Sequence, residues 1–600
     1  EAGVKFSTMT SAYLVVVVFG VGTDYCLFIV SRYREELQDK DYVEGQNEAM
    51  ARITPVIGAS AITVIVALLS LGVSRLGINQ TSGYALAIGV AITLLAAVTL
   101  VPALMSLFGR HLFWPVKVKA VPKVRRFGWR VIGRWVSARP FLMAVPIVVL
   151  LLVPYAGLPG LKTSVDIIDQ LPQSMDSVKG YRVLSEHFDM GELWPSYAVI
   201  EQKDGNMTSA ESLQAIGELA QRVEAVEGVS RVTCYATPAP ELSGLAAQMR
   251  TLSGALATGG GLDQLGALEG VGDLLQGLPL QYPGVLDSAH FRQAAAGAAQ
   301  GADLAAQVAT TPSERLAMLR FQLQDAVNGI SDGLDGLAAE FRLDESTPFS
   351  AYLMTSYFSK FRTMTRMDIV VSGDRNQTET LDTVTRVREA LQDGIRSLDL
   401  EGVSSYVGGE TAQRADIMLT NESDFGKVMV LSIVGILVVI MILLRSILAP
   451  LYMVVTVLLS YGCTLGIATW IFLDGFHQSS LIYIVPLFVF VILVALGADY
   501  NIFLVSRIRE EAQKRPMKEA VAEAVGNTGG IITACGIILA GTFATLLTSP
   551  LLVAVEVGGA IAIGVILDTF LVRAILVPAL ARILGRWGWW PSALSRKEPR

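Results

Sequence analysis

The chain has 600 residues, of which 52% are hydrophobic and only 17% are charged, and its mean hydropathy is +0.50. A soluble protein of this size would need a far more polar surface, so the composition predicts a membrane protein with several spans. The net charge of −7 argues against a nucleic-acid partner, which would need a basic face. The four cysteines and four histidines are scattered, so neither a disulfide framework nor a metal site is expected.

In chain order, the first prediction is a set of transmembrane helices. Eight or nine apolar runs reach about the 20 residues that a span requires. The predicted spans cover residues 9–31, 53–73, 83–108, 141–158, 427–444, 449–473, 480–506, 529–549 and 553–581.

Lysine and arginine in the loops orient these spans, because short cytoplasmic loops are enriched in both. Nine of them lie between Arg110 and Arg139, and the segments after the first and seventh predicted spans are also basic. Arg75 is an exception, since it lies on the opposite side. The large polar block at 159–426 is therefore expected outside the cytoplasm.

The flanks of this block predict an α+β domain. Strand–helix–strand patterns on both sides suggest a split βαβ arrangement. We expect strands at 194–202, 228–235, 364–372 and 402–408, and helices at 209–227 and 379–397. Between them, residues 240–345 are rich in Gly, Ala and Leu. Leucines at helical spacing predict an inserted helical hairpin there, and a partly disordered low-complexity insertion is the alternative.

One motif occurs twice, at residues 22–36 and 497–511, and the two copies align without a gap. Each copy places an Asp-Tyr pair inside an apolar run that ends in Ser-Arg-x-Arg-Glu-Glu. The pairs are Asp24-Tyr25 and Asp499-Tyr500. A carboxylate at such a depth costs roughly 2.5–3.5 kcal/mol on insertion scales and usually marks a path for ions or protons.

The similarity of the two ends continues beyond this motif. Thr54 corresponds to Thr528 if a one-residue gap is allowed, and Val-Pro-Ala-Leu follows at 101–104 and at 577–580. The last three spans of each half therefore correspond. The second half also has a leading span, an external domain and two further spans that have no counterpart in the first half. We expect that the first repeat is incomplete at its N-terminus and that the parent protein has about twelve spans in parallel duplication. A naturally short form is the alternative.

The doubled motif resembles the MMPL-type transporters of the RND superfamily, as do the segment 568–573 (Asp-Thr-Phe-Leu-Val-Arg) and the Val-Pro-Ala-Leu sequences. The resemblance covers nearly the whole chain except the insertion. It implies a pseudo-twofold α-helical bundle, an α+β porter domain outside the membrane, and proton-driven export of lipids or other hydrophobic molecules.

The expected organisation has six parts. They are the last three spans of a first repeat (1–110), a basic cytoplasmic linker (111–140), the first span of a second repeat (141–158), the extracytoplasmic porter domain with its insertion (159–426), five further spans (427–583) and a cytoplasmic tail (584–600).

Asp24 and Asp499 are the predicted proton carriers. A carboxyl group in a dry bundle is disfavoured as an anion, so it can take up and release a proton. Tyr25 and Tyr500 are expected to pair with the carboxylate of the neighbouring helix, and the resemblance implies that the two helices exchange such contacts at the centre of the bundle. Small residues near each acid are expected to let helices approach closely. They are Gly20, Gly22, Ala495 and Gly497. A purely structural hydrogen-bonded cluster is the alternative.

Three residues are candidates for an accessory role. Asp568 lies in the last span and has no acidic counterpart in the first half, so it either pairs with Arg573 or joins the relay. Thr528 would support the carboxylates, although a helix start is the preferred interpretation for it and for Thr54. The Arg-x-Arg-Glu-Glu tails predict ion pairs four residues apart. These pairs are Arg32–Glu36 and Arg507–Glu511.

The sequence contains no phosphate-binding loop and no hydrolase motif, so we expect neither ATP hydrolysis nor another enzyme activity. The predicted function is proton-driven export of lipids or other hydrophobic molecules at a bacterial cytoplasmic membrane, with a proton gradient and no cofactor. One alternative is a sterol- or lipid-sensing receptor of the same fold. Another is an interaction module in which the insertion at 240–345 docks a cell-envelope protein.

Overall fold

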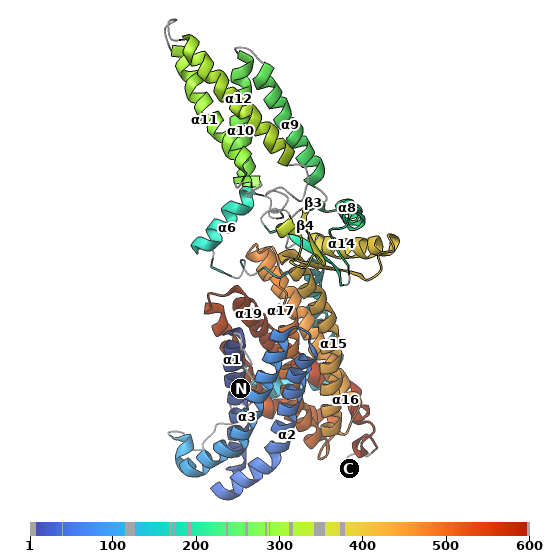
Figure 1. Ribbon diagram of the computed structural model, residues 1–600. Coiled ribbons are helices and arrows are strands. Elements are labelled where there is room, and N and C mark those ends of the chain that lie inside the picture. The colour runs from blue at the N-terminus through green and yellow to red at the C-terminus, as the bar shows by residue number, and fades with distance from the viewer. Residues whose placement is uncertain are drawn as a thin grey trace. The chain divides into compact units, whose positions relative to one another are not determined.

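The computed structural model divides the chain into two compact units (Figure 1). The helical unit comprises residues 1–181 and 416–600, and the sheet unit comprises residues 182–415. The residues that the structure describes are 8–38, 40–114, 127–166, 168, 171–172, 174–188, 191, 194–203, 205–235, 238–258, 262–281, 285–286, 288–310, 316–340, 354–372 and 378–596. The middle of the predicted basic linker, residues 115–126, lies outside them.

Nine helices in the described part of the chain are long and apolar enough to cross a membrane, which confirms the prediction of a polytopic helical protein. They are α1 (Thr8–Glu36), α2 (Tyr42–Ser70), α3 (Gly77–Phe108), α5 (Pro140–Leu152), α15 (Glu410–Leu444), α16 (Leu448–Thr469), α17 (Val485–Ala512), α18 (Met517–Ala544) and α19 (Leu552–Leu567). Five of them continue into tighter or wider turns, namely η1 (Leu71–Val73), η5 (Val153–Gly160), η7 (Trp470–Gly475), η8 (Thr545–Thr548) and η9 (Asp568–Leu576).

Shorter elements join or extend these helices. They are η2 (Gly109–Phe113), α4 (Phe127–Ala138), β1 (Thr163–Ser164), α6 (Asp176–His187), β6 (Leu481–Ile482), α20 (Val577–Leu584), η10 (Gly585–Trp589) and η11 (Ala593–Ser595). Part of the predicted basic linker is therefore the helix α4, which packs against α18.

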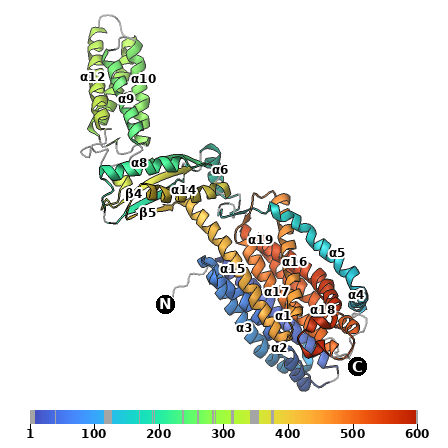
Figure 2. The ribbon, with the colours of Figure 1, turned by 90° about the vertical axis from the view of Figure 1, so that its right-hand side faces the viewer.

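Helix α17 lies at the centre of the helical unit. In its most apolar stretch 94% of the residues are buried, against 44% for α1. Helices α2, α16, α18 and α19 pack around α17, and α1, α2 and α3 lie side by side (Figure 2). The sequence of α17 before its Asp-Tyr pair is apolar on every face, which is typical of a helix surrounded by other helices.

Polar contacts connect α15 to the turn between α2 and α3. The buried Asp424 carboxylate accepts hydrogen bonds from the Ser74 hydroxyl, at 2.8 Å, and from the Arg75 backbone N–H. The hydroxyls of Ser70 and Ser432 are 2.6 Å apart. A buried carboxylate requires such partners. The Arg75 side chain also pairs with Asp424 at 3.6 Å, which explains why a cation occurs on the side of the unit where the loops carry few.

The sheet unit contains a four-stranded antiparallel sheet in the order β3-β4-β2-β5. Its strands are β2 (Ser196–Gln202), β3 (Val229–Cys234), β4 (Met364–Val371) and β5 (Val403–Gly408). Helix α8 (Ala210–Glu224) joins β2 to β3 and helix α14 (Thr378–Ser397) joins β4 to β5, and the two helices pack against each other. The predicted strands and helices are thus confirmed within a few residues, in the strand order of a split βαβ fold.

In the residues that the structure describes, the insertion forms four helices rather than the predicted two (Figure 1). They are α9 (Pro238–Thr258), α10 (Leu262–Gln281), α11 (Ala289–Thr310) and α12 (Leu316–Glu340). Small residues allow close packing here, because Gly297 faces Ile330 and Gly333 faces the backbone of Ala294. The hydroxyls of Ser253 and Ser331 also meet at 2.7 Å. The end of the predicted insertion, residues 341–345, lies outside the described residues.

Candidate functional site

The structure brings the two Asp-Tyr pairs into one buried region of the helical unit. Asp24 lies on α1 and Asp499 on α17, and they are 5% and 7% exposed. The Tyr500 hydroxyl donates a hydrogen bond to Asp24 Oδ2. The two copies of the motif therefore meet directly, through a contact between residues 476 positions apart in sequence.

The reciprocal contact, from Tyr25 to Asp499, is not made. Asp499 Oδ1 instead accepts a hydrogen bond of 3.0 Å from the Thr63 hydroxyl on α2. The Tyr25 hydroxyl finds no hydrogen-bond partner among the described residues, and neither does Asp24 Oδ1. The expected symmetric exchange is thus only half present. Sequence reasoning missed Thr63, because a threonine in an apolar helix usually bonds to its own backbone. The Thr63 hydroxyl also lies 2.6 Å from Ser60 O, so its one hydrogen is shared between that carbonyl and Asp499 Oδ1.

Large aromatic side chains, rather than small ones, connect α1 to α17. The ring centroids of Phe28 and Phe503 are 4.4 Å apart, those of Phe28 and Tyr500 are 5.9 Å apart, and those of Tyr13 and Phe488 are 5.4 Å apart. At the depth of the acids, the two motif helices therefore contact each other through aromatic rings and the Tyr500–Asp24 hydrogen bond.

The small residues beside the acids face other helices. A methyl group on Gly20 would collide with Leu539 of α18, one on Gly22 would lie 3.2 Å from Thr93 of α3, and one on Gly497 would lie 3.0 Å from Val457 of α16. Ala495 is buried within α17. The three glycines do allow close helix packing. The helices that approach at these positions are α18, α3 and α16, and not the partner motif helix.

Asp568 pairs with Arg573, and this pair also reaches the Asp-Tyr site. Arg573 Nη2 binds Asp568 Oδ2 and donates to Leu496 O at 3.3 Å. The guanidinium carbon lies 3.9 Å from the centre of the Tyr500 ring, in the geometry of a cation–π contact. The pairing of Asp568 with Arg573 is confirmed, and this ion pair carries the cation that covers Tyr500. A part for Asp568 in the relay stays a prediction.

The backbone of η9 explains how two residues five positions apart can pair. At 3.6 residues per turn they would lie about 140° apart around an α-helix. Asp568–Leu576 instead form a π-helical segment, whose repeat connects residue i to residue i+5. The wider turn brings Asp568 and Arg573 to the same face of the helix.

Thr528 does not support either carboxylate. Its hydroxyl donates to Ala524 O at 2.8 Å, within its own helix. The helix-start interpretation is also wrong, because Thr528 lies in the interior of α18 and Thr54 in the interior of α2. Thr528 therefore neither begins a helix nor contacts a relay acid. It lines a cavity beside Arg573.

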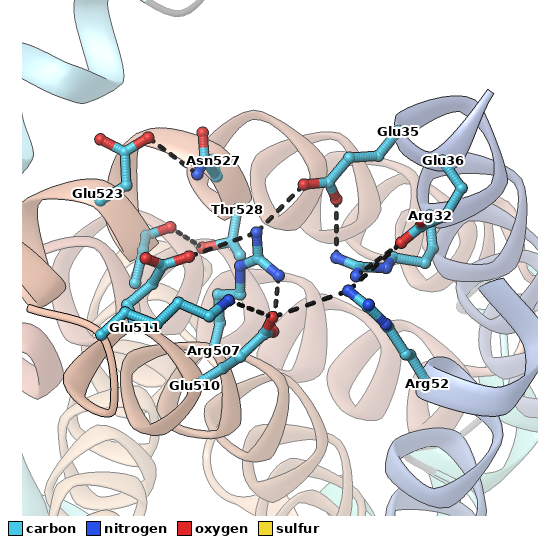
Figure 3. A network of polar contacts seen from close by, with 12 residues as sticks. Arg32, Glu35, Glu36, Arg52, Arg507, Glu510, Glu511, Glu523, Asn527 and Thr528 are labelled. Atoms are coloured by element: carbon cyan, nitrogen blue, oxygen red, sulfur yellow. Dashed lines mark hydrogen bonds and ion pairs between the residues drawn. The ribbon is translucent and has the colours of Figure 1, made fainter. Parts of the chain in front are cut away.

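A network of charged side chains surrounds the ends of α1 and α17, at what we call the charged end of the unit (Figure 3). The two predicted ion pairs are confirmed, at 2.8 Å for Arg32–Glu36 and 3.6 Å for Arg507–Glu511. Arg507 also reaches Glu35 across the two helices at 3.1 Å. The charged tails therefore join the two motif helices, which local spacing could not show.

A third arginine adds α2 to this network (Figure 3). Arg52 of α2 pairs with Glu48 at 2.6 Å on its own helix and with Glu36 of α1 at 3.5 Å. It also lies 4.0 Å from Glu510 of α17. Three helices that carry the acid site or its threonine partner are thus held together at one end. Among the described residues, no group of three or more His, Cys, Asp or Glu side chains could hold a metal ion.

Comparison with known proteins places this arrangement in a family. The sequence model of the MMPL family matches residues 1–143 and 286–600. A membrane protein of Streptomyces coelicolor is 30% identical over 596 residues, which are 99% of this chain and 56% of that protein. An apo-petrobactin exporter of Bacillus anthracis is 26% identical over 99% of this chain and 65% of its own length. MmpL10 of Mycobacterium leprae, described as a probable transport protein, is 27% identical over 98% of this chain and 75% of its own length.

The chain therefore spans less than two thirds of the Streptomyces protein and of the exporter. The relatives are membrane proteins, and the nine apolar helices agree with a multi-pass membrane protein. Since the family match covers most of the 600 residues, including both Asp-Tyr motifs, this chain belongs to the MMPL family.

Proposed function

We propose that this chain takes part in proton-driven export of lipids or other hydrophobic molecules, with siderophore-like molecules included, across a bacterial cytoplasmic membrane. The observation that carries the proposal is the buried contact between the Tyr500 hydroxyl and Asp24, which joins the two repeats at an ionisable group. Ionisable residues inside a membrane bundle are costly and usually mark proton or ion paths.

The local charges favour a site that exchanges one proton at a time. Arg573 and Asp568 neutralise each other, so the net charge of the region depends on Asp24 and Asp499. Two carboxylates in one low-dielectric region repel each other and resist simultaneous ionisation. The unpartnered Asp24 Oδ1 is a suitable acceptor for the incoming proton.

Protonation at Asp24 would change its contact with Tyr500. An ionised carboxylate only accepts hydrogen bonds, whereas the protonated acid can also donate one. Because Tyr500 lies on α17 and its ring touches both Phe28 and Arg573, a shift of its hydroxyl would be transmitted to α1 and η9. This is the proposed link between proton transfer and helix movement.

The names of the relatives support transport as the class of activity. One is an exporter of apo-petrobactin and another a probable transport protein. A lysine- and arginine-rich side of the helical unit supports a cytoplasmic location for the charged end, with the sheet unit outside the cytoplasm. The cargo and the orientation are parts of the proposal.

Proton flux in proteoliposomes tests the proposal. Wild-type protein and the Asp24→Asn and Asp499→Asn variants would be reconstituted with a pH-sensitive dye inside and a lipophilic fluorescent probe as cargo. Asp474→Asn is the matched control, because Asp474 is exposed in the turn η7. We expect proton flux and probe movement to be lost in both site variants and kept in the control. Full proton-driven transport by Asp24→Asn would refute the relay, and probe binding without flux in the wild type would favour the receptor alternative.

A further inference from the structure

A small cavity lies between α4, α17, α18 and η9, on one side of Arg573. Its lining includes Trp129 of α4, Leu504 of α17, Thr528 of α18, and Thr569 and Arg573 of η9. The space open to the centre of a water molecule is about 10 Å³. That volume is at the lower limit for one bound water.

Two of the lining residues, Thr569 and Arg573, carry polar atoms that lack partners in the part of the chain that the structure describes. Arg573 Nε and Nη1 and Thr569 Oγ1 find no hydrogen-bond partner among the described residues. Both side chains belong to residues that are 1% exposed. Leaving a buried donor unpaired costs about 1–3 kcal/mol, and more for a charged group. A water molecule at this position would accept from the guanidinium and donate to the threonine, which meets the two to four partners that buried waters normally have.

The charge balance favours water over an anion. Arg573 is already paired with Asp568, so a second negative group would leave the region with an excess negative charge in a low dielectric. Water leaves that balance unchanged. It supplies the missing acceptor for the guanidinium and the missing partner for the Thr569 hydroxyl.

The position of the cavity places this water between the acid site and the charged end. The Arg573 guanidinium covers the Tyr500 ring on one side and lines the cavity on another. Leu504 lies one helical turn beyond Tyr500 along α17, and Arg507 of the charged end follows.

Trp129 lines the cavity on the side of α4. A methyl group on Gly529 would lie 2.6 Å from the Trp129 ring, so the indole rests directly on the backbone of α18. Gly133 meets Ala522 O, and Gly526 meets Arg130, in the same way. Helix α4 can approach α18 this closely because glycines lie at these three contacts.

We propose that this cavity binds one water molecule, which completes the hydrogen bonding of Arg573 and Thr569, fixes the guanidinium over Tyr500, and is separated from bulk solvent by Trp129. The inference rests on the proposed function in one respect, namely that the position of Tyr500 matters for proton transfer. The binding of the water itself does not depend on transport.

The first test is an experimental structure at a resolution that shows ordered water. We expect a density peak within hydrogen-bond distance of Arg573 Nε or Nη1 and of Thr569 Oγ1, and its loss in the isosteric Thr569→Val variant. An empty cavity in the wild type would overturn the proposal. Crystals grown in bromide give a further check, because an anomalous peak at the site would show an anion in place of water.

The second test measures proton flux in proteoliposomes of the same variants. Thr569→Val should lower flux roughly tenfold, about the effect of one lost hydrogen bond to a charged group, and Thr569→Ser should restore it. Thr542→Val is the control, since that exposed hydroxyl bonds only to Ile538 O among the described residues. Unchanged flux in Thr569→Val would refute the positioning role. If Asp24→Asn retains flux while the water is present, the proposed function fails and the water site stands.

The closing role of Trp129 has a matched control on its own helix. Trp135 of α4 is 64% exposed and does not line the cavity. Trp129→Ala should raise the passive proton leak of proteoliposomes severalfold, because bulk water would reach Arg573, whereas Trp135→Ala should leave the leak unchanged. An equal leak in the two variants would contradict the closure.

Discussion

The Arg573–Asp568 ion pair gives the sharpest energetic prediction. Its side chains are 1% and 4% exposed. Arg573→Gln would leave the carboxylate uncompensated in a low dielectric, which costs roughly 3–5 kcal/mol. It would also remove the cation from the Tyr500 ring, a contact worth up to ~2 kcal/mol when desolvated. The carboxyl group can avoid part of the cost by taking up a proton, so we expect a loss of unfolding free energy near 3 kcal/mol.

The double variant Asp568→Asn/Arg573→Gln separates these contributions. Two neutral amides can hydrogen-bond to each other without a buried charge, so the variant should be more stable than either single variant. The remaining loss should be about 2 kcal/mol, most of it from the missing cation–π contact. Detergent denaturation in mixed micelles, followed by circular dichroism, measures the unfolding free energy of the wild type, of both single variants and of the double variant. If the losses of unfolding free energy in the two single variants sum to the loss in the double variant within about 0.5 kcal/mol, the two residues are not coupled.

Transport activity distinguishes stability from function in the same variants. The folded double variant should still lack proton flux, because nothing charged then covers Tyr500. Arg515→Gln is the control, since Arg515 also pairs with a glutamate, Glu511 at 3.2 Å, but its side chain is 41% exposed. A pair with one member exposed to this extent contributes no more than about 1 kcal/mol, and Glu511 keeps a second partner in Arg507 at 3.6 Å. If Arg515→Gln lost as much unfolding free energy as Arg573→Gln, the large effect at Arg573 could not be attributed to the burial of its ion pair.

Further variants test three individual contacts. Thr63→Val removes the hydrogen-bond donor of Asp499 and should slow proton flux roughly tenfold, as measured in proteoliposomes. Arg507→Gln should lower the melting temperature in detergent by a few degrees. Glu35→Gln in the same protein should add only the small effect of its partly exposed pair with Arg32, because the Arg507–Glu35 contact is already lost. Gly20→Ala should destabilise by about 1–3 kcal/mol through its collision with α18, whereas Gly541→Ala, with open space around it, should be neutral or stabilising in the same denaturation assay.

Local sequence patterns were sufficient for the elements of the fold. Each of the nine helices in the described residues that are long and apolar enough to cross a membrane overlaps a predicted span, because length and apolarity alone mark a span. The strands β2 and β4 and the helix α14 also agree with their predicted ranges within two residues, because alternation and helical periodicity are properties of short segments. The doubled motif likewise identified the buried acids Asp24 and Asp499.

Contacts that depend on packing could not be predicted in this way. The Thr63–Asp499 hydrogen bond joins residues 436 positions apart, and no spacing rule links them. Asp568 and Arg573 meet because η9 is π-helical, and that wider turn leaves no clear periodic signal in the sequence. The sequence predicted too few helices in the insertion. A segment rich in Gly and Ala gives a weak amphipathic pattern even where small residues pack helices tightly.

The asymmetry of the site arises outside the duplicated motif. The motif supplies equivalent Asp-Tyr pairs, yet Asp24 binds Tyr500 and Asp499 binds Thr63. The cation lies on Tyr500 alone among the two motif tyrosines described, because η9 carries Asp568 and Arg573 while the first repeat has Ile92 or Thr93 where Asp568 lies. Two identical acid sites would load protons without preference, whereas unequal partners allow one site to load before the other. A direction of proton movement would therefore depend on α2 and η9 more than on the two acids themselves.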